Sequence, residues 1–406
     1  MTEKDLRENQ PLKGIKVLEF GSFIAAPFCT RLMADFGAEV IKIESPTTGD
    51  PLRNWGLAKY EGKSLWWPIQ ARNKKCITLN LKEDEGTEIV KKLVKEVDIV
   101  VENFRPGTME RWGIGYDDLK EINPSIIMVR ISGFGQTGPY KDKAGFGSVG
   151  ESIGGLRYVT GYPDRPPTRI GVAIGDSLTA MFGVIGALMA LHHRDKSPDK
   201  EGQFIDAALY ESVFAVMESS LTEYMKVGAV RERTGTFLPS VAPSNNYPTK
   251  GGEWIVIGAN SDNIFKRLTK VMGMEELAED ERFATHNARG ENQEEIDKII
   301  SNWTIKQDMN DIVSTLDEAG VPAGGIYSVE DIANDVHYHA RDMILKVMDK
   351  QMGELYMPGV VPKMSGTPGE VKWTGPELGE HNTEIYKDLL NIGDDQYTEL
   401  KERGVI

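Results

Sequence analysis

The chain has 406 residues and a mass of 45.1 kDa, which predicts two domains or one large domain with an insertion. Apolar residues make up 40% and charged residues 27%, the usage of a globular protein with a sizeable core, so a fibrous or peptide scaffold is excluded. The net charge of -15 has the wrong sign for a general binder of nucleic acids or anionic membranes. An anionic ligand therefore needs a local basic pocket.

The cysteine content and the N-terminal segment point to a reducing compartment. Cys29 and Cys76 cannot form a disulfide framework, and they lack the paired spacing of a zinc or iron-sulfur site, so no metal is expected. The N-terminal MTEKDLRENQPLKG is polar, without the apolar core of a signal peptide, and no stretch approaches the roughly 20 uninterrupted apolar residues of a membrane span. We expect a cytoplasmic protein.

Short strands alternate with helices in the first part of the chain. The alternation predicts a mostly parallel sheet covered on both faces, and hence a large Rossmann-like α/β domain. The expected elements are a strand over 15–20, a helix over 27–36, a strand over 39–44, a strand over 77–81, a helix over 83–96, and strands over 97–101 and 126–132.

The second half of the chain changes character at a turn-rich stretch over 231–248. A long apolar helix is predicted before it over 177–194, with Gly183 and Gly186 as a small-residue strip for close packing. A hairpin turning at Gly251 and Gly252, followed by helical patterns, predicts a smaller α+β domain. The predicted domains are a large domain over 1–230, a small domain over 231–330, and a linker and C-terminal segment over 331–406 that returns to the large domain.

Two short glycine motifs have structural as well as functional interpretations. G-x-G-x-x-G occurs at 133–138 and 145–150, but no helix pattern opens after the first and no strand precedes the second, so binding of NAD is disfavoured. G-x-S-x-G occurs at 150–154 and centres on Ser152, with a later histidine, His286, His337 or His339, available as a base. The preceding residues are small and flexible rather than strand-like, which favours a glycine-rich loop over a serine hydrolase.

Basic, amide and aromatic side chains follow the strand over 97–101. They are Asn103, Phe104, Arg105 and Arg111. Open α/β sheets bind ligands at the carboxyl ends of their strands, where arginine can hold phosphates and Phe104 offers an apolar face. The alternative for each basic residue is that its charge is simply exposed to solvent and binds no phosphate.

Asp176 directly precedes the long apolar helix. Aspartate is a favoured N-cap, so a plain capping role is one interpretation. The same geometry suits catalysis, since a carboxylate at a helix N-terminus is expected to stay ionised and Gly175 leaves room beside it for a bulky substrate. A poorly hydrated carboxylate can act as a nucleophile.

Several long blocks resemble the class III CoA-transferases, the group that includes formyl-CoA transferases and carnitine CoA-transferases. The blocks are PLKGIKVLEF, AAPFCTRLMADFGAEVIKIE, RNKKCITLNLK, VVENFRPGTMERWGIGYDDL, NPSIIMVRISGFGQTGPY, IGDS and GVPAGGIYSVEDI, and they span nearly the whole chain. The resemblance implies CoA or acyl-CoA as substrate, no permanently bound cofactor, and a homodimer of two interlocked rings. A hetero-oligomer of homologous subunits is the alternative.

The resemblance also assigns residues. The family's catalytic aspartate falls on Asp176, and its glycine-rich small-domain loop begins at Gly258. The implied CoA contacts are Leu79 and Lys82 near the adenine, Asn103 and Phe104 along the strand end, Arg111 near the phosphates, and Ala25 along the pantetheine route.

The mechanism implied by the family begins with attack of Asp176 on the donor thioester, which gives a mixed anhydride and a CoA thiolate. The thiolate then forms an aspartyl-CoA thioester, and the acceptor carboxylate completes the exchange through a second anhydride. Water must be excluded, because hydrolysis of the anhydride ends the cycle. A closing loop around Gly258 and N–H groups at the start of the Asp176 helix suit that requirement.

Three alternatives remain beside this mechanism. α-Methylacyl-CoA racemases share the fold, but their G-H-D histidine is absent from Gly145-Phe146-Gly147, which favours transfer. The other two alternatives are a non-catalytic CoA-binding subunit and a hydrolase that uses Ser152. For the substrate, Arg165 and Arg169 are candidates to pair with the second carboxylate of a dicarboxylic acid such as succinate, exposure to solvent being the alternative.

Overall fold

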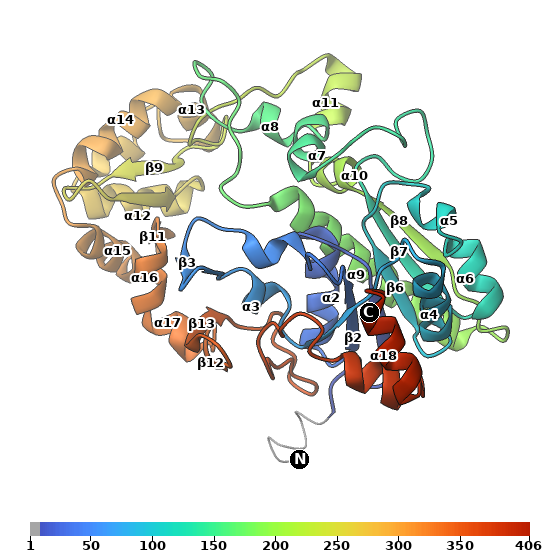
Figure 1. Cartoon of the computed structure of the whole chain (residues 1–406). Helices are drawn as coiled ribbons and strands as arrows, with labels where there is room; N and C mark the ends of the chain where they lie inside the picture. The colour runs from blue at the N-terminus through green and yellow to red at the C-terminus, as the bar shows by residue number, and fades with distance from the viewer. Residues whose placement is uncertain (1–8) are drawn as a thin grey trace. The chain divides into compact units, whose positions relative to one another are not determined.

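The computed structural model describes residues 9–406, so most of the polar N-terminal segment discussed above lies outside the described residues. The chain divides into two compact units (Figure 1). The first comprises the chain through Leu156, Ile170–Thr222 and His339–Ile406, and the second comprises Arg157–Arg169 and Glu223–Tyr338. The independent domains predicted at 1–230, 231–330 and 331–406 stay a prediction.

Six parallel strands form the sheet of the first unit, in the order β5-β2-β1-β6-β7-β8. This confirms the predicted α/β class with a parallel sheet. Leu18 lies opposite Ile41 on one side and Val100 on the other, which places β1 at the centre. The strands are β1 (Lys16–Glu19), β2 (Glu39–Glu44), β5 (Lys74–Thr78), β6 (Ile99–Glu102), β7 (Ile127–Ser132) and β8 (Phe204–Ala208).

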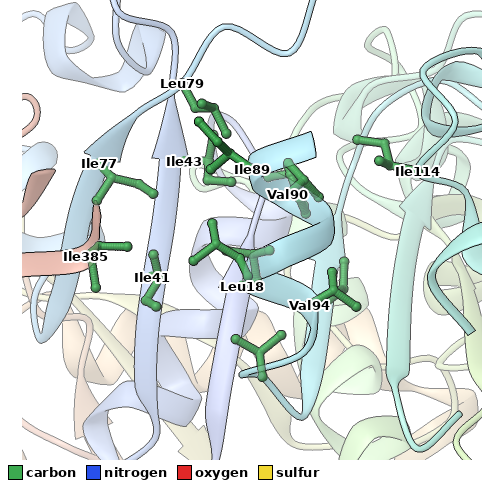
Figure 2. Packing of buried hydrophobic residues seen from close by; sticks show 14 of the residues in the cluster. Leu18, Ile41, Ile43, Ile77, Leu79, Ile89, Val90, Val94, Ile114 and Ile385 are labelled. Carbon is green, nitrogen blue, oxygen red and sulfur yellow. The ribbon is translucent and has the colours of Figure 1, made fainter. Parts of the chain in front are cut away.

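Each face of this sheet has its own apolar core. Because successive strand residues point to opposite faces, Leu18 and Val17 belong to different clusters. On the first face, shown in Figure 2, Leu18 packs with residues of α4 (Asp84–Val94) and with Ile385 from the C-terminal segment. On the second face, α2 (Ala25–Asp35) and α9 (Ile174–Lys196) cover the strands.

Helix α9 is packed on the sheet through small residues. A Cβ added at Gly183 would lie 3.1 Å from Val129 Cγ1, and one at Gly186 would lie 2.8 Å from Ile205 Cγ2, so both glycines permit close contact, as predicted. By length and composition alone, α9 is the one helix of the described residues that could cross a membrane, with a mean hydropathy of 1.7 in its most apolar window. Length and composition alone are weak evidence, because a core helix meets the same criterion.

One face of α9 is nevertheless exposed in the single chain. Ala180 and Ala187 are buried against the sheet. The exposed apolar side chains of the other face are Met181, Phe182, Ile185, Leu188 and Met189. The sequence pattern, apolar nearly all round, predicted a buried helix, and in one chain only the sheet-facing side is buried.

The second unit contains a three-stranded antiparallel sheet in the order β11-β10-β9. Its strands are β9 (Ser244–Pro248), β10 (Trp254–Gly258) and β11 (Ala323–Gly325). The predicted hairpin is present, with Gly252 in its turn at a φ of 82°. Most of the buried apolar side chains of this unit come from the sheet and from α12 (Asp262–Met272), α14 (Gln293–Thr304) and α15 (Met309–Glu318).

The other elements are short. They are η1 (Pro51–Asn54), β3 (Lys59–Tyr60), β4 (Lys63–Ser64), α3 (Trp67–Gln70), α5 (Thr108–Arg111), α6 (Tyr116–Ile122), α7 (Gly147–Ile153), α8 (Leu156–Val159), α10 (Leu209–Phe214), α11 (Ser220–Val227), η2 (Glu275–Ala278), α13 (His286–Glu291), α16 (Val329–Asn334), α17 (Val336–Ala340), β12 (Ile344–Asp349), β13 (Gly353–Pro358), the π-helix η3 (Glu384–Leu389) and α18 (Asp394–Glu402).

Candidate active site

Asp176 lies inside the first turn of α9 rather than before it. The helix begins at Ile174 and its N-cap is Ala173, which supplies no side-chain cap. The capping interpretation of Asp176 is therefore wrong. Its side chain is available for another role.

A cavity of about 310 Å³ opens onto Asp176. Its other walls are the segments that follow β1, β6 and β7, so it lies at the carboxyl edge of the sheet, where a ligand is expected in this class of fold. A second cavity, of about 450 Å³, follows the ends of β1, β2 and β5. Ser22 and Phe104 line both cavities, so the two adjoin.

The structure brings most of the predicted site residues to these two cavities. Ala25, Asn103 and Phe104 line the first together with Asp176. Leu79 and Lys82 line the second, again with Phe104.

Three predicted residues lie elsewhere. Arg111 ends α5, where its Nη2 donates to Thr108 Oγ1 at 2.9 Å, and it lines neither cavity. Arg169 and Gly258 belong to the second unit. Gly258 ends β10, and its N–H donates to the carbonyl oxygen of Pro322. The substrate-binding roles of Arg169 and Gly258 stay predictions.

Asn103 holds the loop after β1. Its side-chain amide donates to the carbonyl oxygen of Ser22 at 2.9 Å, and its Oδ1 accepts from the Ser22 N–H at 3.0 Å. The next N–H, that of Phe104, donates to Glu102 at 2.7 Å. The two strand-end loops that line the first cavity are therefore fixed to each other by side chains.

A buried ionic network lies beneath the same loop. Lys42 Nζ is 2.8 Å from Glu19 Oε1, 2.8 Å from Asp50 Oδ2 and 2.6 Å from the carbonyl oxygen of Gly21. Asp50 in turn accepts the N–H of Phe23, whose φ is 64°, a left-handed conformation that is costly for a bulky residue. The network thus supports an unfavourable backbone turn beside the cavity.

Burial controls the acidity of Asp176. Desolvation, and to a smaller extent the nearby carboxylate of Glu151, raise the pKa of this carboxyl to about 6, against a smaller lowering by a backbone hydrogen bond. The expected ionisation by the helix terminus is thus partly overcome by burial. At neutral pH the group is still mainly a carboxylate, and its raised basicity favours nucleophilic attack.

Two glycines allow this arrangement. A Cβ at Gly147 would lie 2.1 Å from Asp176 Oδ2, closer than any atom tolerates. A Cβ at Gly175 would lie 3.1 Å from the carbonyl oxygen of Gly147 and 3.2 Å from Glu151 Cγ. The start of α7 therefore packs directly against the start of α9.

The geometry disagrees with the serine-hydrolase alternative. Ser152 lies inside α7, and its Oγ donates to the carbonyl oxygen of Ser148 at 2.8 Å. No strand enters this residue, so the strained strand-to-helix turn of a hydrolase nucleophile is missing from this described part of the chain. No histidine is among the described residues that line either cavity, which also disfavours two-base racemisation.

Comparison with known proteins defines the class. The model of CoA-transferase family III matches residues 12–382, and the chain therefore belongs to this family. It is an enzyme of the CoA-transferase class. A CAIB/BAIF family protein from Brucella suis has the same fold, with a TM-score of 0.84, 34% identity, and coverage of 94% of this chain and 100% of that one.

Curated relatives cover the chain almost end to end. It is 56% identical over 400 residues to the succinyl-CoA–D-citramalate CoA-transferase of Chloroflexus aurantiacus, and the matched region covers 98% of this chain and 99% of the relative. It is 39% identical to the beta subunit of the succinyl-CoA–L-malate CoA-transferase of the same organism, with 98% of each chain covered.

Proposed function

We propose that this CoA-transferase moves CoA from succinyl-CoA to D-citramalate, with Asp176 as the nucleophile. The names of the relatives support the donor and the acceptor. The observation that carries the role of Asp176 is its position in a cavity that adjoins the cavity at the ends of β1, β2 and β5. An extended thioester can place its nucleotide end in one cavity and its acyl carbon in the other.

The first chemical step then uses the raised basicity of Asp176. One carboxylate oxygen forms a bond to the thioester carbonyl carbon, the carbon–sulfur bond breaks, and its electron pair leaves on the CoA sulfur. Leu79, Lys82 and Phe104 are proposed to hold the departing CoA, so the thiolate remains available for attack on the aspartyl carbonyl. Retention of the thiolate and exclusion of water together conserve the thioester energy.

Two cations are proposed to recognise the second carboxylate of the substrates. Arg105 and Lys143 line the same cavity as Asp176. Both residues belong to the first unit, as Asp176 does, and Arg169 is kept as a further candidate. Lys143→Met should raise KM for succinyl-CoA more than KM for butyryl-CoA, whereas Lys141→Met, a change outside this cavity, should affect neither. Equal effects on both donors would contradict the assignment.

Trapping the acylated enzyme tests the nucleophile. The protein is incubated with succinyl-CoA, treated with hydroxylamine and mapped by mass spectrometry. A hydroxamate on Asp176 is expected, and Asp176→Asn should lose both the label and transfer while binding CoA and unfolding at the wild-type temperature. Asp142→Asn, at an exposed position, is the matched control. A label on Ser152 would indicate a hydrolase, and retained CoA binding with no label in the wild type would indicate a non-catalytic subunit.

We also propose that a second copy of the chain covers the exposed face of α9. Five neighbouring apolar side chains on one helix form a surface that favours association over exposure to water. The resemblance implies an interlocked dimer, and relatives named as alpha and beta subunits keep a hetero-oligomer as the alternative. Light scattering of the purified chain should give the mass of a dimer, and Ile185→Lys should shift it toward the monomer. A cytoplasmic location is part of the same proposal and is tested by cell fractionation.

A further inference from the structure

A buried glutamate lies beside the start of α9. Glu151, on α7, is 4% exposed, and its Oε1 accepts the N–H of Gly175 at 3.4 Å. Gly175 directly precedes Asp176 in the chain. The absence of a side chain at Gly175 permits the approach, because a Cβ there would lie 3.2 Å from Glu151 Cγ. Glu151 therefore contacts the backbone that carries the candidate nucleophile.

The charge of Glu151 acts on Asp176 as well. It raises the pKa of Asp176, in the same direction as burial. The cations that line the Asp176 cavity are Arg105 and Lys143. The titratable and charged groups on the elements packed around α9 are Cys29, Arg31 and Asp35 on α2, Arg130 on β7, Glu151 on α7, Asp206 on β8, and Tyr210 and Glu211 on α10.

We propose that Glu151 is a positioning residue for acyl transfer. Its carboxylate holds the first turn of α9 through the Gly175 N–H, and its negative charge favours acylation of Asp176. This inference rests on the proposed role of Asp176 as the nucleophile.

The physical reason is the movement of charge during the step. Before attack, Asp176 and Glu151 are two carboxylates in a poorly hydrated site, and like charges at short range repel each other. When the aspartyl oxygen bonds to the acyl carbon and the carbon–sulfur bond breaks, the negative charge leaves Asp176 and resides on the CoA sulfur. The repulsion from Glu151 is relieved in the anhydride, so Glu151 destabilises the free carboxylate relative to the acylated state.

Two substitutions separate the charge from the hydrogen bond. Glu151→Gln keeps an oxygen that can accept the Gly175 N–H but removes the charge. Glu151→Asp keeps the charge but shortens the reach to Gly175. Glu211→Gln, on the neighbouring α10, removes a carboxylate from an exposed position and is the matched control.

The readout is the acidic limb of the pH profile of kcat/KM for succinyl-CoA. We expect Glu151→Gln to move this limb to lower pH by about 0.5 unit or more, because loss of a nearby like charge makes Asp176 a stronger acid. Glu151→Asp and Glu211→Gln should leave the limb within about 0.2 unit of the wild type. A merely structural role for Glu151 would change the unfolding temperature without this selective displacement.

Hydroxylamine labelling distinguishes a failure of Asp176 as the nucleophile from a failure of the role proposed for Glu151. If wild type acquires no label on Asp176, the proposed nucleophile is wrong. If wild type and Glu151→Gln are both labelled and their limbs coincide, only the role of Glu151 is overturned. Equal displacement by Glu151→Gln and Glu151→Asp also overturns it, because the charge is then not the cause. A Glu151→Gln protein that does not fold overturns it too, since the proposal assigns the charge to catalysis and not to folding.

Discussion

Substitution of Lys42 by methionine tests how far the site depends on one buried cation. The Lys42 ammonium lies between Glu19 and Asp50, at 2.8 Å from an oxygen of each, and the Lys42 side chain is 1% exposed. Methionine approximates the length and volume of lysine but supplies no charge and no donor. Glu19 retains its pairing with Lys74, whereas Asp50 loses its neutralising cation.

The expected loss follows from the burial of these groups. Removing one partner of a buried ion pair costs about 3–5 kcal/mol, because the remaining charge is left uncompensated away from water. Lys75 is the matched control on the neighbouring strand β5. It also pairs with two glutamates, Glu39 and Glu384, but its side chain is 21% exposed and theirs are 37% and 48% exposed. Lys75→Met should therefore cost about 1 kcal/mol or less.

Urea unfolding followed by far-UV circular dichroism measures both losses, with the slope against urea checked for each variant. We expect the free energy of unfolding to fall by about 3–5 kcal/mol for Lys42→Met only. Because Lys42 also holds the Gly21 carbonyl and Asp50 holds Phe23, KM for the acyl-CoA should rise in the same variant. Similar losses for the two substitutions would refute the reasoning that burial decides the strength of the pair.

Three further predictions concern carboxylates and their contacts. Gly147→Ala should lower kcat by about 100-fold with little change in unfolding temperature, because Asp176 Oδ2 would lie 2.1 Å from the added Cβ and must move to at least 3.4 Å from it. Gly171→Ala is the control and should be neutral, because no atom lies within 4 Å of a Cβ added there. Full turnover by Gly147→Ala would contradict the required position of the Asp176 carboxylate. The pKa of Asp176 is raised to about 6 and its carboxylate is the reactive form, so kcat/KM should fall as the pH decreases through about 6, and a limb near 4 would contradict the effect of burial. Although burial alone raises the pKa of Glu19, Lys42 and Lys74 lower it to about 2 from 4.5, so its contribution to stability is present above pH 4.5 and lost as the pH falls toward 2. The free energy of unfolding should be less pH-dependent in that window for Glu19→Gln than for wild type, and equal slopes would contradict it.

Apolar patterns located the strands whose two faces are both covered. The segment over 39–44 was predicted as a strand and forms β2 with those bounds, because Val40, Ile41 and Ile43 are β-branched apolar residues that favour a strand. The strand predicted over 77–81 instead spans Lys74–Thr78. Its first residue, Lys74, is fully buried against Glu19, a charge whose partner lies in a distant segment. Local hydrophobicity cannot reveal such a pairing.

The candidate site, like the strands, was predicted from the sequence only in part. Long family-specific blocks identified Asp176 and the strand-end residues that line the two cavities. The sequence did not predict that Asp176 lies within the helix, that burial raises its pKa, or that Glu151 accompanies it. The proximity of Glu151 depends on the contact of α7 with α9, which the glycines at 147 and 175 permit.

The sequence by itself determined the alternation of strands and helices in the first part of the chain, the resemblance to the family and the choice of Asp176 as the candidate nucleophile. These follow from local periodicity and from residue identity along the chain. The tertiary structure alone decided which charges are removed from water and which groups stand next to them. Desolvation and Coulomb energies depend on distance through space, and segments far apart in sequence set that distance only after folding.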